Sequence, residues 1–191
     1  MKKKIKKKGE YGYFSWEKKK RAAVTLGMFL LLAALFVTGY VKTGGRKNLF
    51  TLVTILGCLP ACKQLVAWLM MLPRRSMERE SYDRIKKRAG RLPMLYDLYF
   101  TTYEKNALVD ALAIDGETVA GFCSRTQEHR IFIQGHIQGI LKKSGCPATV
   151  RLFEEPQAFM RRLDAMNGSD GPSAQTEKIQ KIRRAILAIA L

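Results

Sequence analysis

The side chains of this sequence that are best placed for unusual chemistry lie within a long apolar stretch, at Gly57, Pro60 and Lys63. Their three-residue spacing puts them at neighbouring positions on one face of a helix. Glycine permits close approach of another backbone, proline leaves a carbonyl without its helical donor, and lysine can donate to that carbonyl. We therefore predict that this face packs on a neighbouring apolar helix or on a second copy of the chain, as a homo-oligomer. The alternative is that the helix bends at Pro60 and the Lys63 side chain extends to the lipid headgroups.

Other reactive side chains lack the partners that catalysis or metal binding requires. Cys58 and Cys62 share a helix face, but a redox pair would need a quinone or protein site that nothing else in the chain indicates. His129 and His136 lie seven residues apart, and no cysteine or carboxylate is spaced to complete a metal site with them. Cys123 lies in an expected strand and is typical of a packed thiol. The sequence therefore predicts no catalytic residue, no cofactor and no metal site.

Two apolar segments must position the Gly57 face, and each is as long as a membrane span. Residues 22–41 form a run of twenty without a charge, and residues 49–72 contain a single charge, Lys63. A helix of twenty residues is about 30 Å long, which matches the hydrocarbon core of a bilayer. A signal peptide would have a shorter apolar run and no second apolar segment directly after it. We expect residues 22–72 to form a transmembrane helical hairpin.

Basic residues are concentrated beside this hairpin. The net charge is +18; residues 1–21 contain ten Lys or Arg against two acids, residues 73–91 eight against three, and residues 92–191 twelve against eleven. A nucleic-acid-binding domain would carry the charge on itself, so nucleic acid is not an expected partner. Charge beside membrane segments favours anionic lipid as the partner. The residues expected to contact lipid are Lys2, Lys3, Lys4, Lys6, Lys7, Lys8, Arg74, Arg75, Lys86, Lys87 and Arg88.

The same distribution predicts a topology. Lys and Arg flank both membrane entries more heavily than the turn, which holds Lys42, Arg46 and Lys47. The positive-inside rule then places both termini in the cytoplasm of a multi-pass cell-membrane protein. Residues 1–21 are expected to be a basic cytosolic tail, either disordered and topogenic or adhering to lipid through its lysines and aromatic rings.

The chain after the hairpin has the pattern of an α+β domain of about four strands. Residues 73–91 are expected to be a basic connecting helix, and residues 92–191 a cytosolic domain. Within it, residues 94–105, 106–115 and 118–124 are expected strands with a hairpin turn at Asp115–Gly116. A helix over residues 127–144, a fourth strand over 148–155 and helices over 156–166 and 176–191 should follow, with the helices largely on one face of the sheet.

This αβββαβαα order resembles, in its αβββαβ part, the core of PD-(D/E)xK nucleases. The resemblance implies acidic metal ligands on the second strand and an acid–x–Lys motif on the third. Asp110 or Asp115 could supply the first ligand, but the third strand reads GFCSR over residues 121–125 and offers neither acid nor lysine. The resemblance therefore implies at most a degenerate nuclease-like fold.

The basic tail with GEYGY at residues 9–13, the helical hairpin and the LGCLPACK stretch at residues 56–63 resemble a group of small two-helix membrane proteins of Gram-positive anaerobic bacteria. That resemblance implies a bacterial inner-membrane location and assigns no activity. We expect a membrane-anchored binding or regulatory domain, with a membrane or cytosolic protein as a further candidate partner. The alternative is a membrane-associated enzyme acting on a phosphorylated or lipid substrate.

Overall fold

The computed structural model of the chain describes residues 6–45, 49–101, 106–124, 130–168 and 176–190. It divides the protein into two compact units, one formed by residues 14–75 and the other by the N-terminal segment up to Tyr13 together with residues from Ser76 onward. We call them the hairpin and the α+β domain, and each is described by itself.

The hairpin consists of α1 (Tyr13–Thr43) and α2 (Leu49–Leu69), and both are long and apolar enough to cross a membrane. α2 continues through Pro60 without a break. Among the described residues, all the large hydrophobic side chains that are exposed lie between Val24 and Leu72, except Ile131 and Phe132. A surface of this size in water would be strongly unfavourable, whereas in lipid it is the expected surface of a membrane span.

The α+β domain has the predicted fold class and element order. α3 (Arg79–Ala89) precedes β1 (Met94–Thr101), β2 (Asn106–Asp115) and β3 (Thr118–Phe122), and α4 (Arg130–Lys143), β4 (Thr149–Phe153), α5 (Pro156–Asn167) and α6 (Thr176–Ile189) follow. The sheet order is β1-β2-β3-β4, antiparallel except for the parallel β3–β4 pair. The predicted Asp-Gly turn is confirmed, because Asp115 pairs with Thr118 across it.

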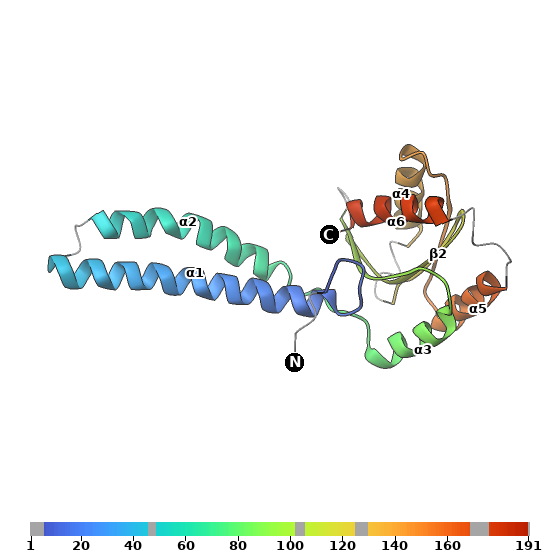
Figure 1. Ribbon diagram of the computed structural model, residues 1–191, viewed down its shortest axis with the longest axis horizontal. Coiled ribbons are helices and arrows are strands. Elements are labelled where there is room, and N and C mark those ends of the chain that lie inside the picture. Colours follow the sequence, from blue (N-terminus) through green and yellow to red (C-terminus); the bar gives the residue numbers. More distant parts are fainter. Residues whose placement is uncertain (1–5, 46–48, 102–105, 125–129, 169–175, 191) are drawn as a thin grey trace. The chain divides into compact units, whose positions relative to one another are not determined.

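Helices cover both faces of this sheet, so the expectation that they lie largely on one face was wrong (Figure 1). α4 and α6 pack on one face through Ile137, Leu141 and Ile186, and α3 and α5 pack on the other through Ile85 and Phe159. The physical reason is visible in β2, where every residue from 107 to 114 is buried. A strand that carries apolar side chains on both of its faces must be covered on both sides.

Two expected boundaries at the hairpin also differ. α1 begins at Tyr13, so residues 13–21 are helical, and residues 6–12 belong to the α+β domain and do not form a separate tail. The connecting helix was expected over residues 73–91, but α3 spans only Arg79–Ala89. Residues 74–78 are irregular, and within them the Ser76 hydroxyl donates to Asp97 and the Met77 carbonyl accepts from Tyr11.

Candidate functional site

The hairpin brings one member of the predicted intramembrane face into helix–helix contact. A Cβ atom added at Gly57 would overlap the Cδ2 atom of Leu32, which is buried on α1. Ala61, one turn further along α2, is fully buried. Pro60 and Lys63 are exposed. The contact face of α2 therefore runs through Gly57 and Ala61, and small residues let the two helices approach closely there.

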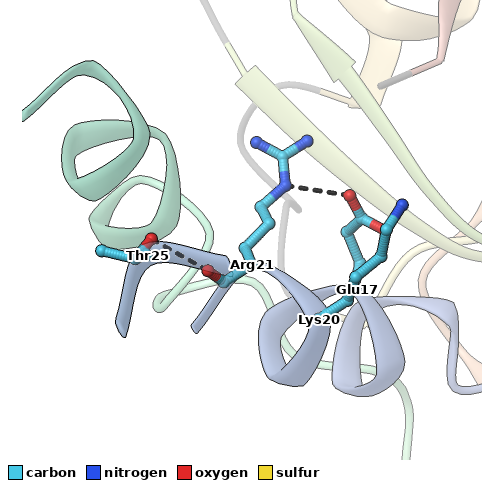
Figure 2. Close-up of polar contacts among 4 residues, drawn as sticks. All are labelled: Glu17, Lys20, Arg21 and Thr25. Carbon is cyan, nitrogen blue, oxygen red and sulfur yellow. Dashed lines mark hydrogen bonds and ion pairs between the residues drawn. The ribbon is translucent and has the colours of Figure 1, made fainter. Parts of the chain in front are cut away.

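The polar start of α1 balances part of its own charge. Arg21 Nε donates to Glu17 Oε1 at 2.9 Å, and Lys20 Nζ lies 3.9 Å from Oε2 of the same carboxylate. Figure 2 shows the three side chains together at the start of α1. Thr25 Oγ1 donates to the Arg21 carbonyl at 2.9 Å, so its hydroxyl is satisfied within the helix (Figure 2). At the same end of the hairpin, Lys18 Nζ donates to the carbonyl of Leu72 at 2.7 Å. These bonds tie the basic start of α1 to the end of the second apolar segment.

The residues predicted to contact lipid are in different situations. Lys2, Lys3 and Lys4 lie outside the described residues, and Arg88 forms an ion pair with Asp164. Lys6 Nζ donates to the Tyr11 carbonyl at 2.6 Å, which is a structural role within the domain. Lys7, Arg75, Lys86 and Lys87 are exposed, and Lys8 and Arg74 are partly buried. The exposed lysines of α3 are therefore the best placed for an anionic surface.

The larger finding of the structure is a site that the sequence interpretation missed. Residues 6–12, which we call the strap, cover the free edge of β1. The backbone N–H of Tyr96 donates to the Gly9 carbonyl at 2.9 Å, as it would to a neighbouring strand. Gly9 has φ +87°, and a Cβ there would lie 2.8 Å from Leu95 Cδ2 and 3.1 Å from Leu187 Cδ2. Only glycine fits this position without strain.

A stack of two tyrosine rings holds the middle of the strap. Tyr11 lies on Tyr82 of α3 with ring centroids 3.9 Å apart and 12° between the planes, and Tyr82 meets Tyr96 edge-on at 5.0 Å. Lys6 and Lys86 lie 5.6 Å from the Tyr11 and Tyr82 ring centroids respectively. The Tyr11 hydroxyl donates to the Met77 carbonyl at 3.1 Å. Strap, α3 and the segment that follows the hairpin thus meet in one cluster.

The carboxylate of Asp97 joins the two chain connections between the domain and the hairpin. Its Oδ2 accepts from the backbone N–H of Gly12 at 2.7 Å and from the Ser76 hydroxyl at 2.5 Å. Asp97 is 1% exposed and has φ +52°, the only positive φ of a non-glycine residue among the described residues. Aspartate tolerates this backbone region better than most residues.

The charge of Asp97 is poorly compensated. Its second oxygen, Oδ1, is buried without a hydrogen-bond partner among the described residues, and no ion pair with a described Lys, Arg or His is formed. The strand register pairs Tyr96 with Ala111 and Leu98 with Val109, which places Asp110 of β2 opposite Asp97. Asp110 is fully buried. Burial raises the pKa of Asp97, with the Asp110 charge adding to the rise, and the bonds from Ser76 and Gly12 oppose it.

Asp110 is the residue that the nuclease resemblance would make a metal ligand. Its Oδ2 accepts from both the backbone N–H and the hydroxyl of Ser124, each at 2.7 Å. Its neighbour Cys123 is buried, and burial together with the Asp110 charge raises the pKa of that thiol to about 12. Within the described parts of the chain, no group of three or more His, Cys, Asp or Glu side chains could hold a metal ion. Asp110 therefore serves as the acceptor that fixes the end of β3.

The strap has a sequence signal that could have revealed it. The stretch GEYGY places glycines at positions 9 and 12 around Tyr11, and paired glycines beside an aromatic residue favour a chain that turns closely over a surface. The prediction of a basic tail over residues 1–21, either disordered and topogenic or adhering to lipid, did not use this glycine pattern. Comparisons with protein-family models, with curated proteins and with solved structures found no match to this chain.

Proposed function

We propose that the protein is a membrane-anchored cytosolic domain with a binding or regulatory role, held at the bilayer by a two-pass hairpin. The observation that carries the proposal is the distribution of exposed apolar side chains: nearly all lie on α1 and α2, whereas the α+β domain buries its own in two clusters. A folded domain that needs no lipid is thus joined to two helices that do. Such a construction keeps the domain at the membrane surface.

The orientation follows from the basic residues. They are more numerous on the outer sides of the two apolar runs, in residues 1–21 and 73–91, than between the runs, where Lys42, Arg46 and Lys47 lie. With both termini in the cytoplasm, these basic residues face the leaflet surface that attracts Lys and Arg, by about 1 kcal/mol each.

A topology experiment tests this part of the proposal. In a chain whose native cysteines are replaced by serine, Thr43→Cys should react with a membrane-impermeant thiol reagent on intact cells. Ser144→Cys, at an exposed position after α4, should react only after the cells are permeabilised. Labelling of the Ser144→Cys chain on intact cells would contradict the cytosolic location.

Anionic lipid is the ligand we propose for the exposed lysines of α3. The double variant Lys86→Glu/Lys87→Glu should weaken the association of α3 with membranes that contain phosphatidylglycerol. The measurement is hydrogen exchange of residues 79–89 in nanodiscs of phosphatidylglycerol against phosphatidylcholine, at low and high salt. The wild-type chain should be better protected in anionic discs at low salt only. Lys142→Glu/Lys143→Glu, at the exposed end of α4, is the matched control and should behave as wild type.

A further inference from the structure

The strap and the segment after the hairpin end on one buried oxygen, Oδ2 of Asp97, although Gly12 and Asp97 are 85 positions apart in sequence. Both covalent connections to the hairpin therefore leave the domain beside the same carboxylate. A change in the charge of Asp97 therefore alters how strongly both the strap and the segment after the hairpin are held to β1.

The geometry makes this attachment depend on whether Asp97 is charged. An ionised carboxylate loses its hydration on burial. The two donors on Oδ2, the Gly12 N–H and the Ser76 hydroxyl, offset only part of that loss, because Oδ1 has no donor among the described residues. Asp110 on the neighbouring strand adds a second buried carboxylate. If the strap leaves, water reaches Asp97 and its charge is hydrated again.

We propose that the strap is a detachable edge of the sheet, controlled by the proton on Asp97: the protonated carboxyl locks the strap, and the ionised carboxylate leaves it poised to detach. The proposal goes beyond the proposed function, because it concerns a conformational equilibrium of the domain whichever partner it binds. Detachment would uncover the Tyr96 N–H on the edge of β1 and the Tyr82 ring, both of which the strap covers. An exposed strand edge is a surface on which another segment can pair.

The direction of the pH effect follows from linkage. Asp97 binds its proton more tightly with the strap docked than with the strap released, since burial raises its pKa only in the docked state. Docking is therefore strongest at acid pH and weakens as the pH rises from the ordinary pKa of aspartate to the docked value. Above the docked value the effect is constant. Over the window, the docking constant falls by up to about tenfold per pH unit, because one proton is released.

Other titratable groups around the site do not imitate this behaviour. Tyr11 on the strap has its own pKa raised by burial and by the Asp97 charge, so it stays neutral throughout the window. The pKa of Tyr11 is also shifted by three groups on α3: Arg79 lowers it, and Asp83 and Tyr82 raise it. Glu10 on the strap is exposed and accepts from the Lys7 N–H. The charge of Asp110 on β2 adds to the rise in the pKa of Asp97.

Hydrogen exchange on the full chain in nanodiscs between pH 4.5 and 8.5, corrected for intrinsic rates, tests the proposal. The readout is the protection of peptides covering residues 9–13 and the Tyr96 amide. Wild-type protection should decrease as the pH rises and then level off. Asp97→Asn keeps an acceptor and a residue that tolerates positive φ but removes the charge. Its protection should be independent of pH and higher than the wild-type value at pH 8, because no buried charge opposes docking. Asp83→Asn, on α3, should follow wild type.

Two results would overturn the proposal. One is an Asp97→Asn chain whose strap is protected no better than wild type at pH 8, since the charge would then hold the strap. The other comes from Ser76→Ala, which keeps the carboxylate and removes one donor from it. A hydroxyl stabilises the ionised form more than the neutral form, so this variant should lose protection by about tenfold at pH 8 and by much less at pH 4.5. An equal loss at both pH values would show that docking does not depend on the charge, and this arm remains decisive if Asp97→Asn fails to fold.

Discussion

Replacing Gly9 by alanine should destabilise the α+β domain by about 2–4 kcal/mol. Two terms contribute. A non-glycine residue at φ +87° costs about 1–2 kcal/mol. The new Cβ also lies 2.8 Å from Leu95 Cδ2 and 3.1 Å from Leu187 Cδ2, and Leu95 is only 1% exposed, so the core must shift at a cost of about 1–3 kcal/mol. The total loss of stability cannot exceed the free energy of strap docking, because a strap that leaves the edge of β1 relieves both costs.

Two further glycines separate these terms. Gly145 has φ +70° with open space around its Cβ position, so Gly145→Ala should lose the backbone term alone, about 1–2 kcal/mol. Gly12 has φ +78°, and its added Cβ would meet the flexible end of Lys6, which can move aside. Gly12→Ala should therefore fall between the other two variants. This order depends only on what surrounds each position.

The assay is urea-dependent pulse proteolysis of the full chain in detergent, with the α+β domain detected at its C-terminal end. It avoids fluorescence, because both tryptophans, Trp16 and Trp68, lie in the hairpin. Midpoints converted with a common m-value give the losses. Equal losses for Gly9→Ala and Gly145→Ala would refute the reasoning, since the strap would then not be packed against the core leucines.

Three other predictions concern the hairpin and the buried thiol. Gly57→Leu should disrupt helix packing, and Leu32→Ala should partly restore it in the double variant; thermal unfolding in detergent measures both, and no restoration would contradict the contact. Lys63→Leu should improve membrane insertion by about 2.5–3.5 kcal/mol in a translocon assay, because the side chain is exposed on α2 and makes no contact with α1 that the substitution would remove. Unchanged or weaker insertion would show that the Lys63 charge is not exposed to the hydrocarbon core. Cys123 should be alkylated far more slowly than Cys146 at pH 8, since burial raises the pKa of Cys123 to about 12. Unfolding in urea should abolish the difference, and equal rates in the folded chain would disprove the burial of Cys123.

The sequence was sufficient to predict the elements of the domain because each has a local signal. β2 and β3 are joined at an Asp-Gly turn, and α5 begins with Pro156 in its first turn. The arrangement of helices on both faces was also encoded in β2, where residues 107–109 and 111–114 are apolar, so both faces of the strand carry apolar side chains. This pattern was not used to predict which faces of the sheet are covered. The error concerned the number of buried faces and not the presence of a strand.

The Asp97 site could not be predicted in the same way, because its parts meet only in the folded chain. The whole hairpin separates Gly12 from Ser76 and Asp97, and no periodicity connects the three residues. The positive φ of Asp97 likewise results from tertiary bonds, since its neighbours Tyr96 and Leu98 are ordinary strand residues. On α2, Gly57 could be recognised from the sequence as a contact residue. Only the rotation of α2 about its axis in the structure shows that Pro60 and Lys63 are exposed and do not face α1.

The pairing of the strap with β1 has a consequence for biosynthesis. The strap leaves the ribosome first, yet Asp97, which receives it, is made 85 residues later, after both apolar helices. The edge of β1 can therefore be closed only when the intervening hairpin has been accommodated elsewhere, and the closing contact is of long sequence separation and hence slow. Until then the nascent domain presents an open strand edge, which makes this interval the one in which a chaperone or another nascent chain has most access to it.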